Sequence, residues 1–139
     1  MKSKIRTFAS LGIGESTSLS RTILPEDVAR FADISGDYNE LHTDPSYAKT
    51  TQFGRTVVHG MYLGALVSQL VGMQLPGKYC LLVKETLEFK KPVFVEDTVV
   101  VTGTLSRKTN ALQLVEITIS ITREEDIVAT GVVLARVLQ

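Results

Sequence analysis

One continuous apolar helix constrains the fold more than any other feature of this 139-residue chain. Residues 58–74 read Val-His-Gly-Met-Tyr-Leu-Gly-Ala-Leu-Val-Ser-Gln-Leu-Val-Gly-Met-Gln. Apolar side chains lie nearly all round this helix, which predicts that it is buried. Small residues recur at every fourth position, at Gly60, Gly64, Ser68 and Gly72. Because each interior glycine costs roughly 1 kcal/mol relative to alanine, a sheet or a ligand must approach this small-residue stripe closely.

The C-terminal half of the chain alternates polar and apolar residues, which is typical of β-strands. We predict one strand whose inner face is formed by Leu81, Val83, Glu85, Leu87 and Phe89, and three more over residues 97–107, 111–122 and 126–138. The alternation changes phase after Leu114, which predicts a β-bulge or strong local twist. Short turns join the last three strands, so they are predicted to form an antiparallel meander. A sheet curled around one buried helix is an α+β domain.

The segment before the apolar helix contains shorter elements. We predict a short strand over residues 18–23. A helix is predicted to begin at Pro25, because proline suits the first helical position. Gly36 is placed to end that helix. Residues 44–49 begin with Asp-Pro, which predicts an N-cap and the first residue of another short helix. The length fits a single domain over residues 1–139.

The overall composition excludes some function classes. Lys plus Arg and Asp plus Glu number 15 each, which argues against bulk electrostatic binding to nucleic acid or to an anionic membrane. A lone cysteine, Cys80, allows no disulfide framework or cysteine-rich zinc site within one chain and is expected to be a small buried side chain. The basic N-terminus has no apolar h-region, and no stretch reaches membrane-spanning length. We therefore expect a cytoplasmic location, with a short organellar transit peptide as the lesser alternative.

The main functional signal is a cluster of polar residues between turn signals. Asp37, Asn39 and His42 fall within six residues, after Gly36 and before Pro45. A carboxylate and an imidazole that converge can take a proton from water and return it elsewhere. On an α-helix, residues five apart point roughly 140° away from each other. We therefore predict that residues 37–42 form a folded loop.

The same residues give the chain a resemblance to the MaoC-like family, and specifically to (R)-specific enoyl-CoA hydratases. The family pattern is Gly-Asp-x-Asn-Pro-x-His-x-Asp-Pro-x-x-Ala, followed by a helix that starts Val-His-Gly-Met. Here residues 36–48 read Gly-Asp-Tyr-Asn-Glu-Leu-His-Thr-Asp-Pro-Ser-Tyr-Ala, and residues 58–61 read Val-His-Gly-Met. The similarity continues through residues 75–77 and 89–97. Glu40 replaces the usual proline, which removes some stiffness from the loop but no catalytic group.

The resemblance implies a hot-dog fold, in which an antiparallel sheet wraps a long helix, usually in a homodimer. It also implies syn hydration of a trans-2-enoyl thioester to an (R)-3-hydroxyacyl thioester, and the reverse dehydration. No metal or redox cofactor is expected, and the acyl carrier is coenzyme A or acyl carrier protein. Asp37 and His42 are the expected catalytic pair, and the sequence leaves open which is the acid and which the base.

Four further residues are expected at the substrate. Gly60 begins the buried helix, where free N–H groups and the positive dipole end can bind a thioester oxygen that gains negative charge. Asn39 orients the water or Asp37, or else stabilises the turn. Ser68 is expected to face the pocket, with tight packing as its alternative. Val71, three residues further on, is expected to limit the length of the acyl chain.

The remaining signals favour ordinary structural roles. His59 is the only other histidine, and the resemblance gives it no acid or base role, so we interpret it as structural. Four basic residues are placed to meet a coenzyme A phosphate, although surface solvation is the preferred interpretation for each: Arg55, Lys84, Lys90 and Lys91. A hot-dog thioesterase and a non-catalytic acyl-thioester-binding subunit are the alternative functions. The Asp37–His42 pair argues against the second, since a binding module does not need it.

Overall fold

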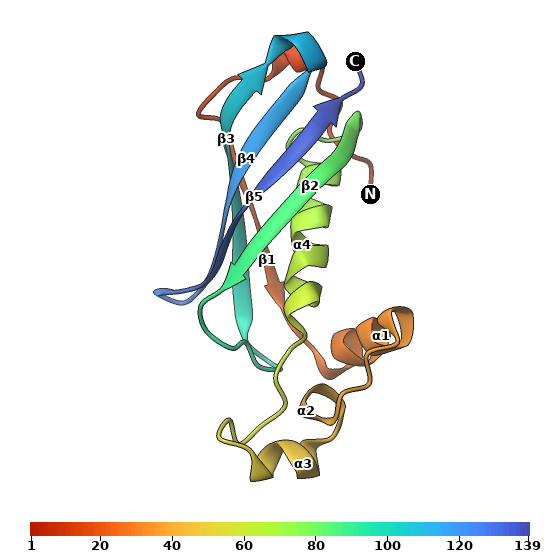
Figure 1. Ribbon diagram of the computed structural model, residues 1–139, viewed down its shortest axis with the longest axis vertical. Helices are drawn as coiled ribbons and strands as arrows, with labels where there is room; N and C mark the ends of the chain where they lie inside the picture. Colours follow the sequence, from red (N-terminus) through yellow and green to blue (C-terminus); the bar gives the residue numbers. More distant parts are fainter.

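A computed structural model describes residues 1–139 and places one long helix against a five-stranded antiparallel sheet (Figure 1). Two one-turn 3₁₀ helices lie at Phe8–Ser10 and Asn110–Leu112. The other elements, in chain order, are β1 (Ser16–Thr22), α1 (Pro25–Ser35), α2 (Glu40–Thr43), α3 (Pro45–Thr50), α4 (Gly60–Met73), β2 (Cys80–Phe89), β3 (Thr98–Thr109), β4 (Leu114–Arg123) and β5 (Asp126–Val137).

The strands lie in the order β1-β3-β4-β5-β2, and every neighbouring pair is antiparallel. The predicted meander of the last three strands is therefore confirmed. Helix α4 lies along the concave face of the sheet, while α1, α2 and α3 gather beyond the N-terminal end of α4 (Figure 1). This arrangement confirms the predicted α+β class and matches the hot-dog fold that the resemblance implied. No helix in the structure has both the length and the apolarity that crossing a bilayer requires.

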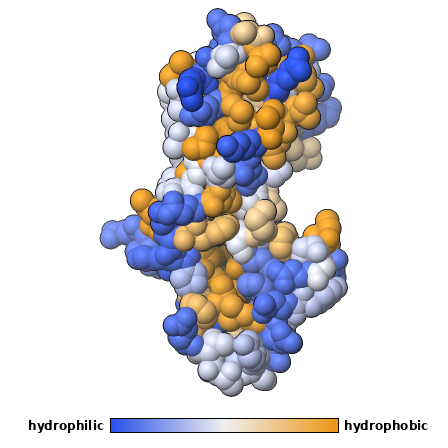
Figure 2. All heavy atoms as spheres, viewed as in Figure 1, coloured by the Kyte–Doolittle hydropathy of each residue, from blue (hydrophilic) through white to orange (hydrophobic).

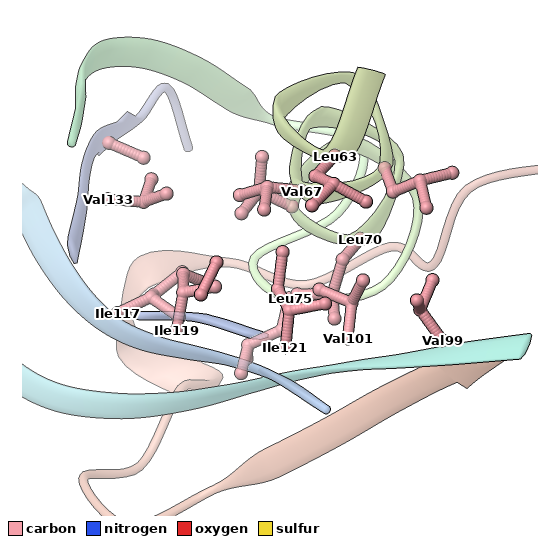
Figure 3. Packing of buried hydrophobic residues seen from close by; sticks show 14 of the residues in the cluster. Leu63, Val67, Leu70, Leu75, Val99, Val101, Ile117, Ile119, Ile121 and Val133 are labelled. Carbon is pink, nitrogen blue, oxygen red and sulfur yellow. The ribbon is translucent and has the colours of Figure 1, made fainter. Parts of the chain in front are cut away.

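The hydrophobic core lies between α4 and the inner face of the sheet. Leu63, Val67 and Leu70 point from the helix toward the strands, whose buried side chains point back at them (Figure 3). The fully buried strand residues include Val99, Val101, Ile117, Ile119, Ile121 and Val133. Alternate residues of a strand share one face, which is why the odd-numbered positions of β4 form one side of this core.

The strand register corrects two predictions. In β2, the register shifts between Leu82 and Lys84, so Val83 is an extra, bulged residue. Leu81 consequently pairs with exposed Arg136, whereas Glu85, Leu87 and Phe89 lie on the inner face of the sheet as predicted. The single face predicted for this strand is therefore wrong at its start.

The predicted bulge in the third strand is also wrong. Residues 110–112 form a 3₁₀ turn and Gln113 has a left-handed backbone with φ 51°, so β4 begins only at Leu114 and alternates regularly from there. The change of phase in the sequence marks the end of a turn. Register shifts occur instead at Ser106 of β3 and Val128 of β5, on the strands that flank β4.

The two edges of the sheet differ in chemistry. β1 is short and mostly polar, reading Ser-Thr-Ser-Leu-Ser-Arg-Thr. β2 is longer and exposes Leu81, Leu82, Val83 and Phe89, with 42–55% of each side chain accessible. Hydrophobic surface covers much of the upper body where β2 and α4 lie (Figure 2). A long apolar edge strand favours pairing with another chain unless something covers it.

Candidate active site

The site begins where α1 ends. Gly36 has a left-handed backbone with φ 75° and donates its N–H to the Ala32 carbonyl, so it ends the helix as predicted. The chain then turns outward, and the N–H of Asp37 donates to the Ser35 hydroxyl at 3.1 Å. The exposed Asp37 carboxylate accepts the Asn39 N–H at 3.1 Å. These short-range bonds shape the turn and leave carboxylate lone pairs free for a substrate or water.

Residues 37–42 are not wholly a loop, which corrects that prediction. Asn39 is the N-cap of α2, and its side-chain oxygen accepts the Leu41 N–H at 2.9 Å. His42 lies within this one-turn helix. Asp37 lies in the turn before α2, and His42 lies within α2. The two side chains can converge because they do not belong to the same helix, where residues five apart would point away from each other. Of the two roles expected for Asn39, the hydrogen bond from the Leu41 N–H favours stabilisation of the turn, because it occupies the side-chain oxygen.

His42 is oriented by the chain just before α4. Its Nδ1 lies 2.6 Å from the carbonyl oxygen of Val57. In return, the N–H of Val57 donates to the Leu41 carbonyl at 3.1 Å. These two bonds tie α2 to the entry of the buried helix, so His42 is positioned by main-chain groups that come from another segment.

Three ionisable side chains gather at this point. Ligand-type atoms of Asp37, His42 and His59 all lie within 4.8 Å of one another. The imidazoles of His42 and His59 stack with ring centroids 4.0 Å apart and an interplanar angle of 29°. The sequence predicted the meeting of Asp37 and His42 but assigned His59 only a structural role. Its position directly before Gly60, at the start of a buried helix, was the signal that it lies beside them.

The geometry of this cluster disfavours a shared metal ion. A metal binds an imidazole nitrogen along the lone pair, in the plane of the ring. Stacking at an interplanar angle of 29° favours in-plane lone pairs that lie side by side over lone pairs that converge on one ion. One nitrogen of each ring also faces a backbone carbonyl oxygen. The absence of a metal stays a prediction.

Gly60 borders a pocket of about 390 Å³ next to His42. As the first residue of α4, its N–H has no acceptor within the helix, and the side chain of His59 does not cap it. The positive end of the helix dipole therefore lies at this pocket. The pocket is lined by His42, Phe53, Val57, Val58, Gly60, Leu63, Phe89, Lys90, Lys91, Pro92 and Val93.

His42 also faces a second pocket, of about 280 Å³, on the side of α1. Apolar side chains of α1, including Val28 and Ala32, line it together with Tyr38 and Thr43. Gly60 is not part of this pocket. The imidazole of His42 thus lies between two pockets. Only the pocket of about 390 Å³ also borders Gly60, whose N–H is free at the start of α4.

The small-residue stripe packs partly against β2. A Cβ at Gly60 would lie 3.0 Å from the Phe89 ring, and a Cβ at Gly64 would lie 3.1 Å from the Glu85 carboxylate. The sheet therefore accounts for the first half of the stripe. Further along α4, Ser68 is exposed, whereas the side chain of Val71 is 2% exposed and belongs to the core. Neither lines the pocket at His42, so their predicted substrate roles stay predictions.

The basic residues proposed for a phosphate group are distributed unevenly. Lys90 and Lys91 line the pocket at His42, but each also pairs with an acid, Glu88 and Asp126 respectively. The Arg55 guanidinium lies 3.9 Å over the Phe94 ring, and Lys84 is exposed on β2. Two of the four candidates therefore lie at the pocket.

Cys80 takes no part in this chemistry. It lies at the start of β2, at the opposite end of that strand from the pocket residue Phe89. Burial raises the pKa of its thiol to about 11, so the unreactive thiol form predominates at neutral pH. This agrees with the interpretation of Cys80 as a small apolar residue.

Comparisons with known proteins identify the family of this chain. The chain is 49% identical over 90 residues to an (R)-specific enoyl-CoA hydratase of Aeromonas caviae, covering 65% of this chain and 67% of that protein. It is 38% identical over 99 residues to an (R)-specific enoyl-CoA hydratase of Rhodospirillum rubrum, covering 71% and 69% respectively. The solved structure of the (R)-hydratase from A. caviae involved in PHA biosynthesis superposes with a TM-score of 0.89 at 37% identity, covering 92% of this chain and 98% of that one. Residues 8–126 match the MaoC like domain, and the chain belongs to this family of hot-dog proteins.

Proposed function

We propose that this protein is an (R)-specific enoyl-CoA hydratase, a hydro-lyase that reversibly adds water to trans-2-enoyl thioesters in fatty-acid metabolism. The observation that carries the proposal is that His42 and the free N–H of Gly60 border one pocket, while a carboxylate oxygen of Asp37 lies within 4.8 Å of the His42 imidazole. An acid–base pair and a site for a developing oxyanion are what the addition of water to an enoyl thioester requires. The named relatives support the same reaction.

The tautomer of His42 favours it as the base. Because Nδ1 faces the Val57 carbonyl oxygen, which only accepts hydrogen bonds, Nδ1 carries the proton and Nε2 is free to accept one. Nε2 takes a proton from water as the water oxygen bonds to C3, and the electron pair of the double bond moves toward the thioester oxygen. The N–H of Gly60 stabilises the charge that develops there.

The proton then returns from the imidazolium to C2 on the same face, which completes a syn addition without net loss of charge or atoms. The Asp37 carboxylate accepts a hydrogen bond from the attacking water and balances the charge on His42 while it holds the proton. Dehydration follows the same steps in reverse. Asp37 and His42 act as one coupled unit in this scheme.

The reaction is tested by loss of enoyl absorbance with crotonyl-, hexenoyl- and octenoyl-CoA, and with one matching acyl carrier protein thioester. We expect absorbance to fall without release of free thiol. Thiol release would instead indicate the thioesterase alternative. Binding with neither change would indicate the non-catalytic acyl-thioester-binding subunit.

Stereochemistry gives an independent test of the same proposal. The configuration at C3 depends on which face of the enoyl plane the water attacks, and the similarity to (R)-specific enoyl-CoA hydratases predicts the (R)-3-hydroxyacyl thioester. Coupling the assay to an (S)-specific 3-hydroxyacyl-CoA dehydrogenase should therefore give no prompt NADH. Prompt NADH formation would contradict the proposed (R) specificity.

We also propose that the protein is a homodimer in which β2 pairs with β2 of a second copy. The support is the contrast between the polar edge strand β1 and the apolar edge strand β2. Pairing at β2 would cover the exposed side chains of Leu81, Leu82 and Val83 and satisfy the free backbone groups of this edge.

The mass of the protein in solution tests the proposed β2–β2 homodimer. Light scattering should give twice the chain mass of 15.2 kDa for the wild type, and a single chain mass for the double variant Leu81→Lys, Val83→Lys. Ile34→Lys is the matched control, since Ile34 is 86% exposed but lies on α1 and should leave the dimer intact. A monomeric wild type would contradict the proposal.

A further inference from the structure

His59 lies at the centre of the catalytic cluster, although its side chain is only 2% exposed. Its ring lies between Phe31 of α1 and His42 of α2, with centroid separations of 4.9 Å and 4.0 Å. Phe31 in turn meets Tyr62 of α4 edge-on at 6.0 Å. A column of rings therefore runs from the body of the molecule to the imidazole of His42, and His59 is the ring in contact with it.

A hydrogen bond connects His59 to the other catalytic residue as well. Its Nε2 lies 2.9 Å from the backbone oxygen of Asp37. A carbonyl oxygen only accepts hydrogen bonds, so Nε2 of His59 carries a proton. The Nδ1 atom is buried and has no hydrogen-bond partner, so a proton on it would be a buried donor without an acceptor. His59 is thus neutral and protonated at Nε2.

The two histidines consequently have opposite tautomers. His42 carries its proton on Nδ1, which faces Val57, and His59 carries its proton on Nε2, which faces Asp37. A neutral His59 has a consequence for the reaction. When His42 holds the proton taken from water, a second cation 4.0 Å away would oppose that state, whereas a neutral ring does not.

We propose that His59 is a positioning residue that aligns both members of the catalytic pair. Its ring sets the plane of His42, and its Nε2–H fixes the main chain of Asp37. The carboxylate of Asp37 bonds only to the nearby Asn39 N–H within its own turn, so the distance from Asp37 to His42 depends on His59. A misplacement of about 1 Å at a catalytic group can lower the rate roughly 10²-fold.

Two variants separate the contributions of the ring and the proton. His59→Phe keeps a stacking ring, although a larger one, and loses the donor, whereas His59→Gln keeps a donor near the position of Nε2 and loses the ring. This kinetic part rests on the proposed hydratase activity. We expect His59→Phe to lower kcat roughly 10–10²-fold with KM changed little, because alignment of the pair is lost while the pocket remains. His59→Gln should recover part of kcat.

A merely structural role would give another result. It would lower the melting temperature and the folded fraction, with kcat per folded molecule unchanged in His59→Phe. That outcome would overturn the proposal. Phe31→Leu is the matched control, since it perturbs the far side of the ring column without touching Asp37 or His42, and it should change stability more than kcat.

The tautomers provide a test that needs no turnover. Long-range ¹H–¹⁵N correlation spectra of the wild-type protein, assigned with His59→Gln, should show Nδ1 unprotonated in His59 and Nε2 unprotonated in His42. A proton on Nδ1 of His59 would overturn the proposal even if every variant failed to fold. If the wild type lacks hydration activity while the spectra show the expected tautomers, the proposed function has failed and the arrangement around His59 stands.

Discussion

The body of the molecule, which consists of α4 and the five-stranded sheet, and the proposed catalytic segment, residues 36–59, are built in opposite ways. In the body, α4 packs on five strands, and many side chains between them are fully buried. In the catalytic segment, only Ala48, Val58 and His59 are buried, while Asp37 and Asn39 are exposed. Figure 1 shows α2 and α3 lying apart from the sheet. The proposed catalytic residues therefore lie on a segment that contributes little to the core, as is common for catalytic residues.

The catalytic segment is attached to the body by a few specific contacts. Val57 forms an isolated bridge with Phe94, and the N–H of Val58 donates to the Val93 carbonyl at 2.8 Å. His59 then leads directly into α4. These contacts orient the segment without burying much of it. Substitutions in the two regions should therefore separate activity from stability.

The largest expected effect comes from the catalytic segment. Asp37→Asn and His42→Ala should each lower kcat/KM for hydration by roughly 10²–10⁴-fold, because each removes a group that handles the water or its proton. Asp37 is exposed, so Asp37→Asn should change the melting temperature little, whereas His42→Ala also loses the hydrogen bond to Val57 and should lower it modestly. The double variant should be little worse than the worse single variant, since the two act as a unit.

Turnover and thermal unfolding measured on the same preparations check this prediction. Near-normal turnover in either single variant would contradict the mechanism. A large fall in melting temperature would contradict the distinction between the two regions.

The next effect tests the junction between the two regions, at Gly60. Gly60→Pro removes the N–H at the first helical position, where proline is tolerated, and His59 already has an extended ψ of 131° that suits a following proline. Gly60→Ala adds the same contact with Phe89 but keeps the N–H, so it is the matched control. We expect kcat to be about 10²–10³-fold lower in the proline variant than in the alanine variant. Equal rates would exclude an oxyanion role for this N–H.

A smaller effect is expected from the body itself. Val71→Ala leaves a cavity beneath α4 and should destabilise the protein by roughly 1–3 kcal/mol, seen as a lower melting temperature. The proposal that Val71 and Ser68 limit the acyl chain makes a second prediction for the same variant. If Val71 also borders the channel, the ratio of octenoyl to crotonyl turnover rises, and Val71→Phe lowers it. An unchanged ratio would leave Val71 with a packing role alone.

Much of the body could be predicted from the sequence. Periodicity placed α4 to within about two residues at each end and predicted the order of the last three strands, because burial on one face imposes a regular pattern. The irregularities at Val83, Ser106 and Val128 were missed. A bulge depends on how two strands pair, and the composition of one strand does not encode this.

The candidate site was only partly predictable, for a related reason. Asp37, His42 and Gly60 stand in a local pattern that the family resemblance interprets directly. The position of His59 between Phe31 and His42 depends on three segments meeting, which no local pattern contains. For Ser68 and Val71, helical spacing predicted a shared face of α4, but the structure places one outside and one in the core.

The smallest expected effect concerns an ionisable side chain in the body, Glu85 of β2. Its carboxylate lies over Gly64 of α4 and opposite buried Val133, and Oε1 is buried without a hydrogen-bond partner. Burial raises the pKa of this carboxyl above its ordinary value. The ionised form is therefore less favourable in the folded chain than in the unfolded chain. Its contribution to stability should fall as the pH rises from the ordinary carboxyl range through the raised pKa, and stay level above it.

Glu85→Gln removes this titration and keeps the shape of the side chain. We expect the variant to melt at a higher temperature than the wild type at about pH 8, and the gain to disappear at about pH 3, where Glu85 is protonated in both states. Glu88→Gln on the same strand is the control, because its side chain is 74% exposed and should show no such gain. Turnover should be unaffected, since Glu85 does not line the pocket at His42. A lower melting temperature for Glu85→Gln at neutral pH would contradict this prediction.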